Sequence, residues 1–202
     1  MADSVFVTFE GLDGSGKSTQ AELLGEHLRG LGHEVVLTRE PGGTELGERV
    51  RELVLNGPEV SPWAEAALFA AARAELVARV IRPGLDGGAD VICDRYLDSS
   101  LAYQGIARGL GVGRVLELNR PAIGDLLPDV TFLLLVEPEV ALERAGAVPD
   151  RIEREGVGFL AEVDQAYREL AGAFAGRIVA LDGSLPPTEI ADRVAEQVRQ
   201  RS

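Results

Sequence analysis

A phosphate-binding signature near the start of the chain constrains the fold more than any other feature. The stretch GLDGSGKS, residues 11–18, fits the pattern G-x-x-x-x-G-K-[ST]. It follows the apolar run SVFVTF and precedes STQAELLGEHL, which has helical spacing. A strand, a glycine-rich turn and a helix in this order place backbone N–H groups and a helix N-terminus around an anion. The pattern therefore predicts an α/β protein that binds the phosphates of a nucleotide.

Lys17 stands out in this loop because it is the only lysine of the chain. The sequence has 20 basic residues, and 19 of them are arginines. A narrow cradle needs a compact charge on a slim stem, which lysine offers and the planar guanidinium of arginine does not. We expect Lys17 to act on the terminal phosphates as a catalytic charge, and the Ser18 hydroxyl to bind Mg²⁺. The predicted ATP-binding loop comprises Gly11, Leu12, Asp13, Gly14, Ser15, Gly16, Lys17, Ser18 and Thr19.

Apolar runs rich in β-forming residues recur along the chain and alternate with helical segments. They lie at 4–9, 34–38, 90–94, 130–136 and 177–182. Strands that alternate with helices imply crossover connections, so we expect one α/β domain over 1–202 with a mainly parallel, five-stranded sheet and helices on both faces. Ligands bind such sheets beyond the carboxyl ends of the strands. The polar residues that follow each run are therefore the candidates for chemistry.

The charge and hydropathy of the chain limit its partners. The formal net charge is -13, which disfavours lasting contact with nucleic acid or an anionic membrane surface, because both are polyanions. The apolar runs are far shorter than the roughly 20 residues of a membrane span, and we expect a cytoplasmic protein. The single cysteine, Cys93, has no partner for an internal disulfide, and we expect it in the core of a strand.

Two further stretches bear on the second substrate. In VICDRY, Asp94 ends an apolar run, where its carboxylate is well placed to hold Mg²⁺; the alternative is a helix N-cap for YLDSSLAYQG. In TREPGGTELG, Arg39 is either a ligand-binding charge or a surface charge before a helix capped at Thr44. A guanine-reading N-K-x-D segment is absent, because the only lysine is Lys17. A GTPase is therefore disfavoured.

Five motifs, taken together, resemble those of the bacterial thymidylate (dTMP) kinases. They are EGLDGSGKST, TREPGGT, LFAAARAELV, DRYLDSSLAYQG and DRIERE, in the order and at the approximate spacing of that family. The resemblance covers nearly the whole chain. It implies a P-loop nucleoside monophosphate kinase fold with a short lid over about 144–156. It also implies transfer of the γ-phosphoryl group of ATP to dTMP, with Mg²⁺, in a homodimeric enzyme.

The resemblance assigns most of the acceptor site. It implies that thymine stacks on Phe69, that Arg73 donates to a base carbonyl and that Arg95 binds the acceptor phosphate. Asp13 would contact the sugar 3'-hydroxyl, and Tyr103 would crowd the 2' position against ribonucleotides. The further implied contacts are Ser100 and Gln104 in the base pocket and Arg39 near the phosphate. From its local pattern alone, Phe69 is equally a core position of an alanine-rich helix.

The lid segment departs from the family pattern in one respect. Members with a small residue at the position of Ser15 generally carry catalytic arginines in a lid of the form R-x-R-G-x-x-D-R-x-E. Here the segment reads RAGAVPDRIE and lacks the middle arginine. We expect Arg151, supported by Arg144, to neutralise the charge that builds up on the transferring phosphoryl group. The alternative for Arg151 is an ion pair with Glu153 or Glu155 on a solvated helix end.

The sequence therefore predicts a dTMP kinase that uses Mg-ATP, with Lys17, Asp94, Arg95 and Arg151 as its catalytic residues. Two other readings stay open. One is a kinase for another small acceptor, such as dUMP, dCMP or a deoxynucleoside. The other is an ATP-binding regulatory protein with residual activity, which the arginine-poor lid keeps open.

Overall fold

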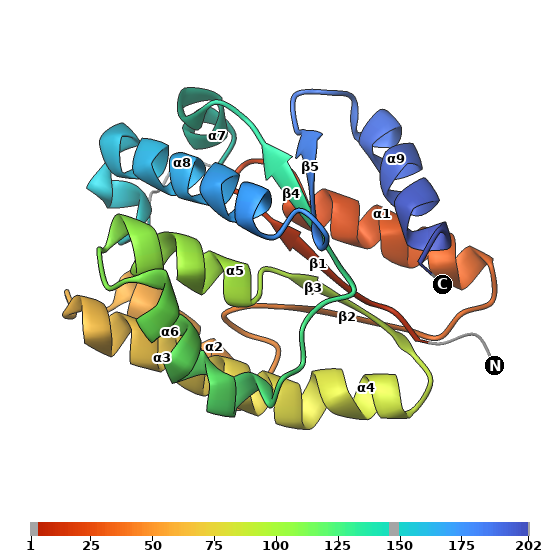
Figure 1. Ribbon diagram of the computed structural model, residues 1–202, viewed down its shortest axis with the longest axis horizontal. Helices are drawn as coiled ribbons and strands as arrows, with labels where there is room; N and C mark the ends of the chain where they lie inside the picture. The colour runs from red at the N-terminus through yellow and green to blue at the C-terminus, as the bar shows by residue number, and fades with distance from the viewer. Residues whose placement is uncertain (1–3, 146–149, 202) are drawn as a thin grey trace.

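The computed structural model describes residues 4–145 and 150–201. A five-stranded sheet lies at its centre, with strand order β2-β3-β1-β4-β5 and parallel pairing throughout. Figure 1 shows the strands between two layers of helices. The strands are β1 (Phe6–Glu10), β2 (Val35–Arg39), β3 (Asp90–Asp94), β4 (Val130–Leu135) and β5 (Ile178–Asp182). The five predicted runs are thus all strands, and the predicted fold class is confirmed.

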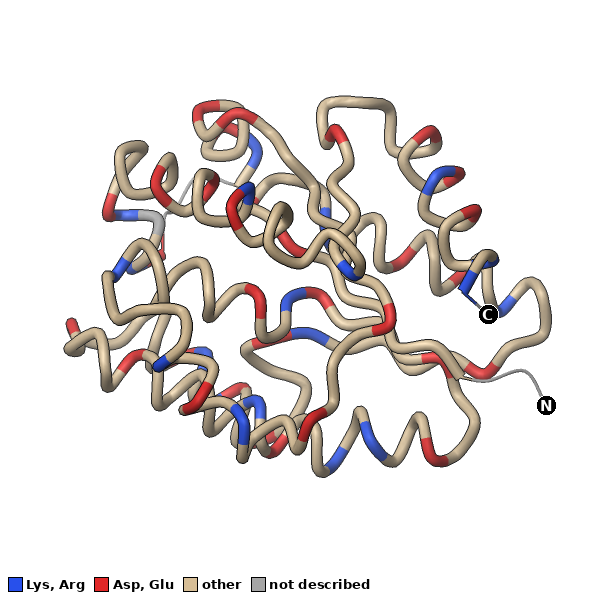
Figure 2. Tube along the Cα trace, in the orientation of Figure 1, with Lys and Arg blue, Asp and Glu red and all other residues tan. Residues whose placement is uncertain are grey.

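The helices follow the strands as crossover connections. The α-helices are α1 (Lys17–Gly30), α2 (Glu45–Asn56), α3 (Pro62–Leu76), α4 (Arg82–Asp86), α5 (Leu97–Ser100), α6 (Val112–Ile123), α7 (Pro138–Ala145), α8 (Val157–Ala173) and α9 (Pro187–Arg199). Two π-helical segments, η1 (Val77–Ile81) and η2 (Leu101–Ala107), continue α3 and α5, and η3 (Glu153–Glu155) is a short 3-10 turn. Acidic and basic residues are interspersed along these helices (Figure 2). Of the helices in the described ranges, none has the length and apolar character of a membrane span.

The burial of the strands follows their place in the sheet. All five residues of the central strand β1 are buried, whereas the edge strands β2 and β5 alternate between covered and exposed positions. On one face, Phe9 and Phe132 pack against α1 and α9. On the other face, Phe6 and Cys93 pack against a layer that includes α3, η2, α6 and α8. Cys93 is fully buried, as expected.

The register of the strands positions the site. Phe9 of β1 pairs with Asp94 of β3, and Asp94 pairs in turn with Arg39 of β2. The next residues, Glu10, Arg95 and Glu40, therefore leave the same edge of the sheet side by side. The Arg95 N–H donates to the Phe9 carbonyl at 2.9 Å, and the Glu40 N–H donates to the Asp94 carbonyl at 2.9 Å. Polar residues that are far apart in the sequence converge at this carboxyl edge, as expected for a parallel sheet.

Candidate functional site

The loop over residues 11–18 connects β1 to α1 and leaves the start of that helix open. Gly16 occupies the N-cap position with φ 96°, and it offers no side-chain acceptor to the N–H groups of the first turn. Within the described residues, the buried Ser15 Oγ has no hydrogen-bond partner. Uncapped N–H groups and an unpaired hydroxyl around one loop make a cradle suited to a phosphate.

Two glycines allow this loop to pack closely against its neighbours. A Cβ on Gly11 would lie 2.4 Å from the Leu134 carbonyl oxygen, and one on Gly14 would lie 2.2 Å from the Ala141 carbonyl oxygen. Both glycines have positive φ angles, of 134° and 81°. Glycine is therefore required at positions 11 and 14 by the contacts of the loop with β4 and α7.

Lys17 lies folded into the cradle. Its ammonium group donates to the Leu12 carbonyl at 2.7 Å and lies 3.4 Å from an Asp13 carboxylate oxygen. Burial, followed by the nearby charge of Arg95, lowers the pKa of Lys17 below its usual value. A carbonyl and a half-exposed carboxylate are partners that an incoming phosphate can replace, because the phosphate offers more negative charge to the same ammonium group.

The two predicted metal ligands lie in contact. The Ser18 hydroxyl donates to an Asp94 carboxylate oxygen at 2.5 Å. Helix α5 begins at Leu97 with Tyr96 at its N-cap position, so the alternative role of Asp94 as a helix cap is wrong. A hydroxyl and a carboxylate are oxygen ligands of the kind that Mg²⁺ prefers, and they fit a site beside the cradle.

Such a cation would need ligands from elsewhere. In the described ranges, no group of three or more His, Cys, Asp or Glu side chains is arranged to hold a metal ion. Mg²⁺ usually keeps several waters and binds through one or two protein groups plus substrate phosphates. Ser18 and Asp94 therefore fit a metal that arrives with a nucleotide better than a permanently bound one.

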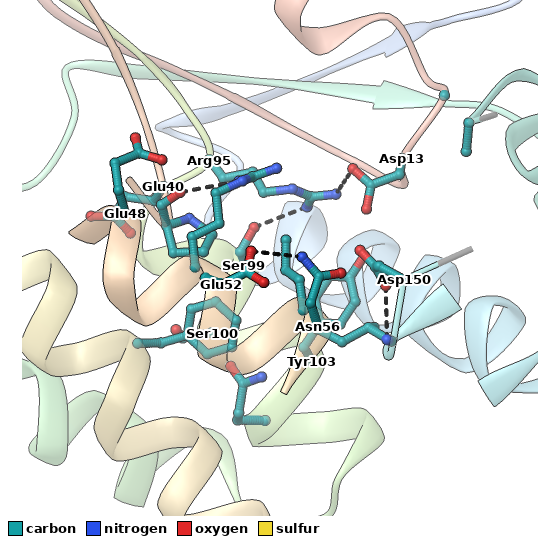
Figure 3. A pocket seen from close by; sticks show the side chains of 18 of the residues that line it. Asp13, Glu40, Glu48, Glu52, Asn56, Arg95, Ser99, Ser100, Tyr103 and Asp150 are labelled. Atoms are coloured by element: carbon teal, nitrogen blue, oxygen red, sulfur yellow. Dashed lines mark hydrogen bonds and ion pairs between the residues drawn. The ribbon is translucent and has the colours of Figure 1, made fainter. Parts of the chain in front are cut away.

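A cavity of about 640 Å³ opens beside the cradle (Figure 3). It extends from the phosphate loop to α2, α3 and η2. Eight of the predicted site residues line it: Asp13, Gly14, Phe69, Arg95, Ser100, Tyr103, Gln104 and Arg144. Hence Asp13 and Gly14 of the predicted nucleotide loop share one cavity with most of the predicted acceptor residues, and we call this cavity the acceptor pocket.

Arg95 connects the acceptor pocket to the cradle. Its guanidinium donates to an Asp13 carboxylate oxygen at 2.7 Å and to the Ser99 hydroxyl at 3.1 Å (Figure 3). It also donates to the Tyr167 hydroxyl at 3.1 Å. Burial alone would raise the pKa of Asp13, but Arg95 and Lys17 outweigh this effect and lower it below its usual value. Arg95 also has a positive φ of 69°, unusual for a residue other than glycine. Such a backbone is typical of functional sites whose surroundings hold it in place.

Glu10 shares two hydrogen-bond partners with Arg95, the hydroxyls of Ser99 and Tyr167. Glu10 was not identified from the sequence. Its carboxylate accepts hydrogen bonds from the Tyr96 N–H at 2.8 Å, the Ser99 hydroxyl at 2.6 Å and the Tyr167 hydroxyl at 2.9 Å. Burial, reinforced by the nearby Asp98, raises the pKa of Glu10. Its position directly before Gly11, at the end of a strand, was a signal that could have found it.

We call the residues predicted to contact the base or the 2' position of its sugar the base wall. Four of them, Phe69, Ser100, Tyr103 and Gln104, line the pocket, whereas Arg73 does not. Phe69 also packs against the core, as its local pattern alone predicted, and its stacking on thymine stays a prediction. Arg73 is buried. It donates to Glu40, Ser100, Asn119 and the Tyr96 carbonyl.

Glu40 lines the pocket and is another residue that the sequence did not single out. One of its oxygens accepts from Arg73 at 2.8 Å, while the other has no hydrogen-bond partner in the described part of the chain. Burial raises the pKa of Glu40 to about 7, even though Arg73 acts in the opposite direction. The pocket therefore presents a buried carboxyl group that titrates near neutral pH.

Arg39 lies in a different cavity. It lines a groove of about 490 Å³ together with Ser18 and Asp94, and its guanidinium donates to both carboxylate oxygens of Glu48 at 3.1 Å. The Thr44 hydroxyl accepts from the Gly47 N–H and caps α2, as the alternative for this stretch predicted. Arg39 is thus closer to the candidate metal ligands than to the base wall.

The predicted lid over 144–156 is only partly described, since residues 146–149 lie outside the described ranges. Arg144, at the end of α7, donates to the Gly183 carbonyl at 3.2 Å and lines the acceptor pocket. Arg151 is buried and donates to the Val54 carbonyl at 2.7 Å and to Glu65 at 2.6 Å. Arg151 thus forms a buried ion pair with Glu65, so the predicted alternative of a pair on a solvated helix end is wrong, and Glu155 pairs with Arg108 instead.

A third cavity, of about 320 Å³, lies on the other side of the cradle. It is lined by Ser15, Gly16 and Thr19 of the cradle region, by Arg144, and by the segment 183–187 between β5 and α9. A Cβ on Gly183 would lie 3.2 Å from the Ser15 carbonyl oxygen. The sequence did not identify this segment, although it follows the last predicted strand, where ligands are expected.

Comparisons with known proteins agree with this arrangement. The sequence profile of the family described as thymidylate kinase matches residues 9–194. The thymidylate kinase of Gloeobacter violaceus is 47% identical over 200 residues, which are 96% of this chain and 92% of that protein. The thymidylate kinase of Pelotomaculum thermopropionicum is 50% identical over 184 residues, which are 89% of this chain and 85% of that protein. A crystal structure of thymidylate kinase from Ehrlichia chaffeensis superposes with a TM-score of 0.80 at 34% identity, covering 96% of this chain and 98% of that one.

Proposed function

Because the chain belongs to the thymidylate kinase family, we propose that it transfers the γ-phosphoryl group of ATP to dTMP and yields dTDP and ADP. The observation that supports this most strongly is the contact between Asp13 of the cradle and Arg95 of the acceptor pocket, at 2.7 Å. Through this pair, the donor phosphate site and the acceptor site share a wall. Two bound phosphates would then meet without either crossing the protein, which is the positioning that phosphoryl transfer needs.

In this proposal the charged groups divide the work. Lys17 and the N-terminus of α1 hold the donor phosphates. Arg95 binds the acceptor phosphate, and Arg51, which also lines the pocket, adds a second positive charge on the side of α2. Asp13 holds Arg95 in place and accepts from the sugar 3'-hydroxyl. Little covalent chemistry is required of the protein, because the acceptor phosphate oxygen is itself the nucleophile.

Mg²⁺ would be held by the Ser18 hydroxyl and the Asp94 carboxylate, together with oxygens of the bound nucleotide. When bound, it supplies neutralising charge to the donor phosphates. The contact between these two side chains supports the assignment. Arg39, in the same groove, would act on the phosphates from the side of β2.

The base wall would select the acceptor. Phe69 supplies a stacking face, which is favourable for any base, so the neighbouring polar groups Ser100 and Gln104 must read the ring edge. Tyr103 would exclude a 2'-hydroxyl. The contact of Arg73 with a base carbonyl stays a prediction, since its donors are now bonded to protein groups such as Glu40 and Ser100.

The two lid arginines differ in how readily they could contact bound phosphates. Arg144 borders both the acceptor pocket and the cavity beside the cradle, and in the proposal it contacts the phosphates of ATP. A catalytic role for Arg151 stays a prediction, because it requires this residue to leave Glu65 and the Val54 carbonyl.

The family membership also supports three proposals about the working enzyme. We propose that residues 1–202 act as one domain, that the enzyme is a homodimer and that it works in the cytoplasm. Size-exclusion chromatography with light scattering tests the dimer. A mass of one chain at micromolar concentration would contradict it.

A coupled ADP-release assay with Mg-ATP tests the function. The acceptors are dTMP, dUMP, UMP, dCMP and thymidine. We expect preferential turnover of dTMP. Preferential turnover of another acceptor would keep the kinase and contradict the base wall, and ATP binding without turnover of any acceptor would favour a regulatory protein.

A further inference from the structure

A buried group of side chains joins the base wall to the lid segment. It consists of Glu65, Gln104, Arg108 and Arg151, and we call it the Glu65 cluster. Glu65 lies in the first turn of α3, and its side chain is 2% exposed. Its partners come from η2, from the residue that follows η2, and from the lid segment. Three segments that are distant in the sequence therefore meet at one carboxylate.

The two oxygens of Glu65 serve different parts of the site. Oε1 accepts from the Gln104 side chain at 2.8 Å and lies 3.4 Å from the Arg108 guanidinium. Oε2 accepts from the Arg151 guanidinium at 2.6 Å. Arg108 also pairs with Glu155 at 2.8 Å, so two carboxylates face two guanidinium groups. Counted together with Glu155, these groups carry no net charge, which is the condition under which charges tolerate burial.

Arg151 is held by more than this ion pair. Its Nε–H donates to the Val54 carbonyl at 2.7 Å, and its backbone N–H donates to the Leu55 carbonyl at 2.8 Å. Its side chain is 8% exposed. If Arg151 moved to the phosphates, Glu65 would lose its strongest cationic partner inside the protein, which is costly for a buried carboxylate.

The neighbours of the cluster belong to the acceptor pocket. Gln104 lines that pocket, and so do Asp150 and Ile152, which flank Arg151, and Leu55 at the end of α2. A displacement of Arg151 would therefore shift one wall of the pocket. Loss of the Glu65 carboxylate would also free the Gln104 side chain, which faces the base in the proposed function.

We propose that Glu65 is a positioning residue for phosphoryl transfer, which couples the base-reading Gln104 to Arg151, and that Arg151 anchors the lid segment instead of contacting the phosphates. This inference rests on the proposed function and deepens it. An acceptor that is bound well by Gln104 favours the anchored lid, and the anchored lid favours tight acceptor binding, since coupling between two sites is reciprocal.

The first test compares Glu65→Gln with Arg151→Ala. Glutamine keeps the shape of Glu65, but its amide has no charge and only one acceptor oxygen, so it cannot accept from both Gln104 and Arg151 as the carboxylate does. We expect both variants to raise the KM for dTMP by roughly 10-fold, with a lower kcat and with the KM for ATP within about threefold of wild type. The double variant should be no worse than either single one. The matched control is Glu75→Gln on the same helix, whose exposed ion pair with Arg79 should leave all three constants unchanged.

Two results would overturn the inference. One is a Glu65→Gln enzyme with wild-type constants. The other is an Arg151→Ala enzyme that loses kcat while its KM for dTMP is unchanged, because that pattern indicates direct action on the transferring group. Turnover of dTMP by the wild type in the same assay tests the proposed function separately.

A second test keeps Glu65 in place and therefore does not depend on the folding of its variants. Calorimetric titration with dTMP gives the dissociation constants of Gln104→Ala, Arg151→Ala and the double variant. Gln104 and Arg151 bind different oxygens of Glu65, so they are linked through this carboxylate. If Glu65 couples them, the effects of the two substitutions on dTMP affinity should be non-additive by about fivefold or more. Additive effects would overturn the inference.

Discussion

The phosphate cradle and the Glu65 cluster both contribute residues to the acceptor pocket, Asp13 and Gly14 from the cradle and Gln104 from the cluster, and are encoded in opposite ways. The cradle is a continuous loop over 11–18, and its contacts are made largely by the backbone and by residues that are close in the sequence. In the Glu65 cluster, side chains make the contacts, and the partners of Glu65 are separated from it by 39, 43 and 86 positions in the sequence. The comparison shows why a local motif can be recognised in a sequence while a long-range cluster of equal importance cannot.

The two regions also differ in how their charges are satisfied. Lys17 pairs with Asp13, whose side chain is 47% exposed, whereas Glu65 is 2% exposed and bonded on both oxygens. A cradle with weak, replaceable partners is suited to binding a ligand. A saturated, buried cluster is suited to holding its neighbours in place.

The largest effect on activity is expected from a substitution in the cradle. Replacement of Lys17 by alanine removes the charge of the cradle, so we expect kcat to fall by about 1,000-fold, which corresponds to about 4 kcal/mol. The midpoint of thermal unfolding should not fall, because burial of the ammonium group is itself unfavourable and lowers its pKa. Steady-state kinetics and calorimetry measure the two quantities. A parallel loss of activity and stability would mean that Lys17 is mainly structural.

The second prediction concerns Glu40, which is buried and, within the described residues, has one carboxylate oxygen without a hydrogen-bond partner. Its pKa in the folded protein is raised by burial to about 7 from an ordinary 4.5. A raised pKa means that the folded protein holds the proton more tightly than the unfolded chain. Stability should therefore decline from pH 4.5 to 7, by up to about 3 kcal/mol.

Glu40→Gln removes this titration, so the difference in unfolding free energy between wild type and variant should change across that window. Urea unfolding at several pH values measures the change. An identical pH dependence of both proteins would show that folding does not raise the pKa of Glu40. The matched control is Glu59→Gln, which removes a carboxylate of the same kind from an exposed loop position.

The third prediction uses the close packing of the cradle. Alanine at Gly14 would place a Cβ 2.2 Å from the Ala141 carbonyl oxygen, so the loop must shift at a cost of about 2 kcal/mol. We expect ATP affinity to fall by roughly 30-fold, as measured by calorimetry. The control is Gly172→Ala in α8, where a Cβ meets no atom within 4 Å. Unchanged ATP binding by Gly14→Ala would contradict the assignment of this loop to the donor phosphates.

The smallest effect is expected at the base wall. Phe69→Leu keeps an apolar side chain against the core but removes the aromatic face, and we expect kcat/KM for dTMP to fall by about 10-fold. The affinity for ATP should stay within about twofold. Equal losses for ATP and dTMP would indicate that the substitution disturbs the fold and not the base contact.

The sequence predicted the regular parts of this architecture well. The five strands, the cradle and the position of Asp94 at a strand end all follow from periodicity and from a motif whose residues are adjacent. The acceptor residues Phe69, Ser100, Tyr103 and Gln104 were placed by family resemblance, since nothing in their local pattern distinguishes a pocket wall from a core.

The remaining features depend on distances that a single sequence does not reveal. Arg73 was expected to face the base, yet it is surrounded by four protein acceptors. Glu65 was not identified, because a glutamate in a first helical turn is ordinary in isolation, and Glu10 was missed although its position directly before Gly11 was a signal. Only the fold brings each of them to its partners.

The transfer of phosphate between two adjacent sites is the central claim, and ³¹P NMR of the wild-type enzyme with Mg-ATP and dTMP tests it most directly. The account predicts that the α-phosphorus signal of dTMP is replaced by the two signals of dTDP, in step with the appearance of ADP. Release of inorganic phosphate with dTMP unchanged would contradict it, because the cradle would then hydrolyse ATP without using the acceptor pocket.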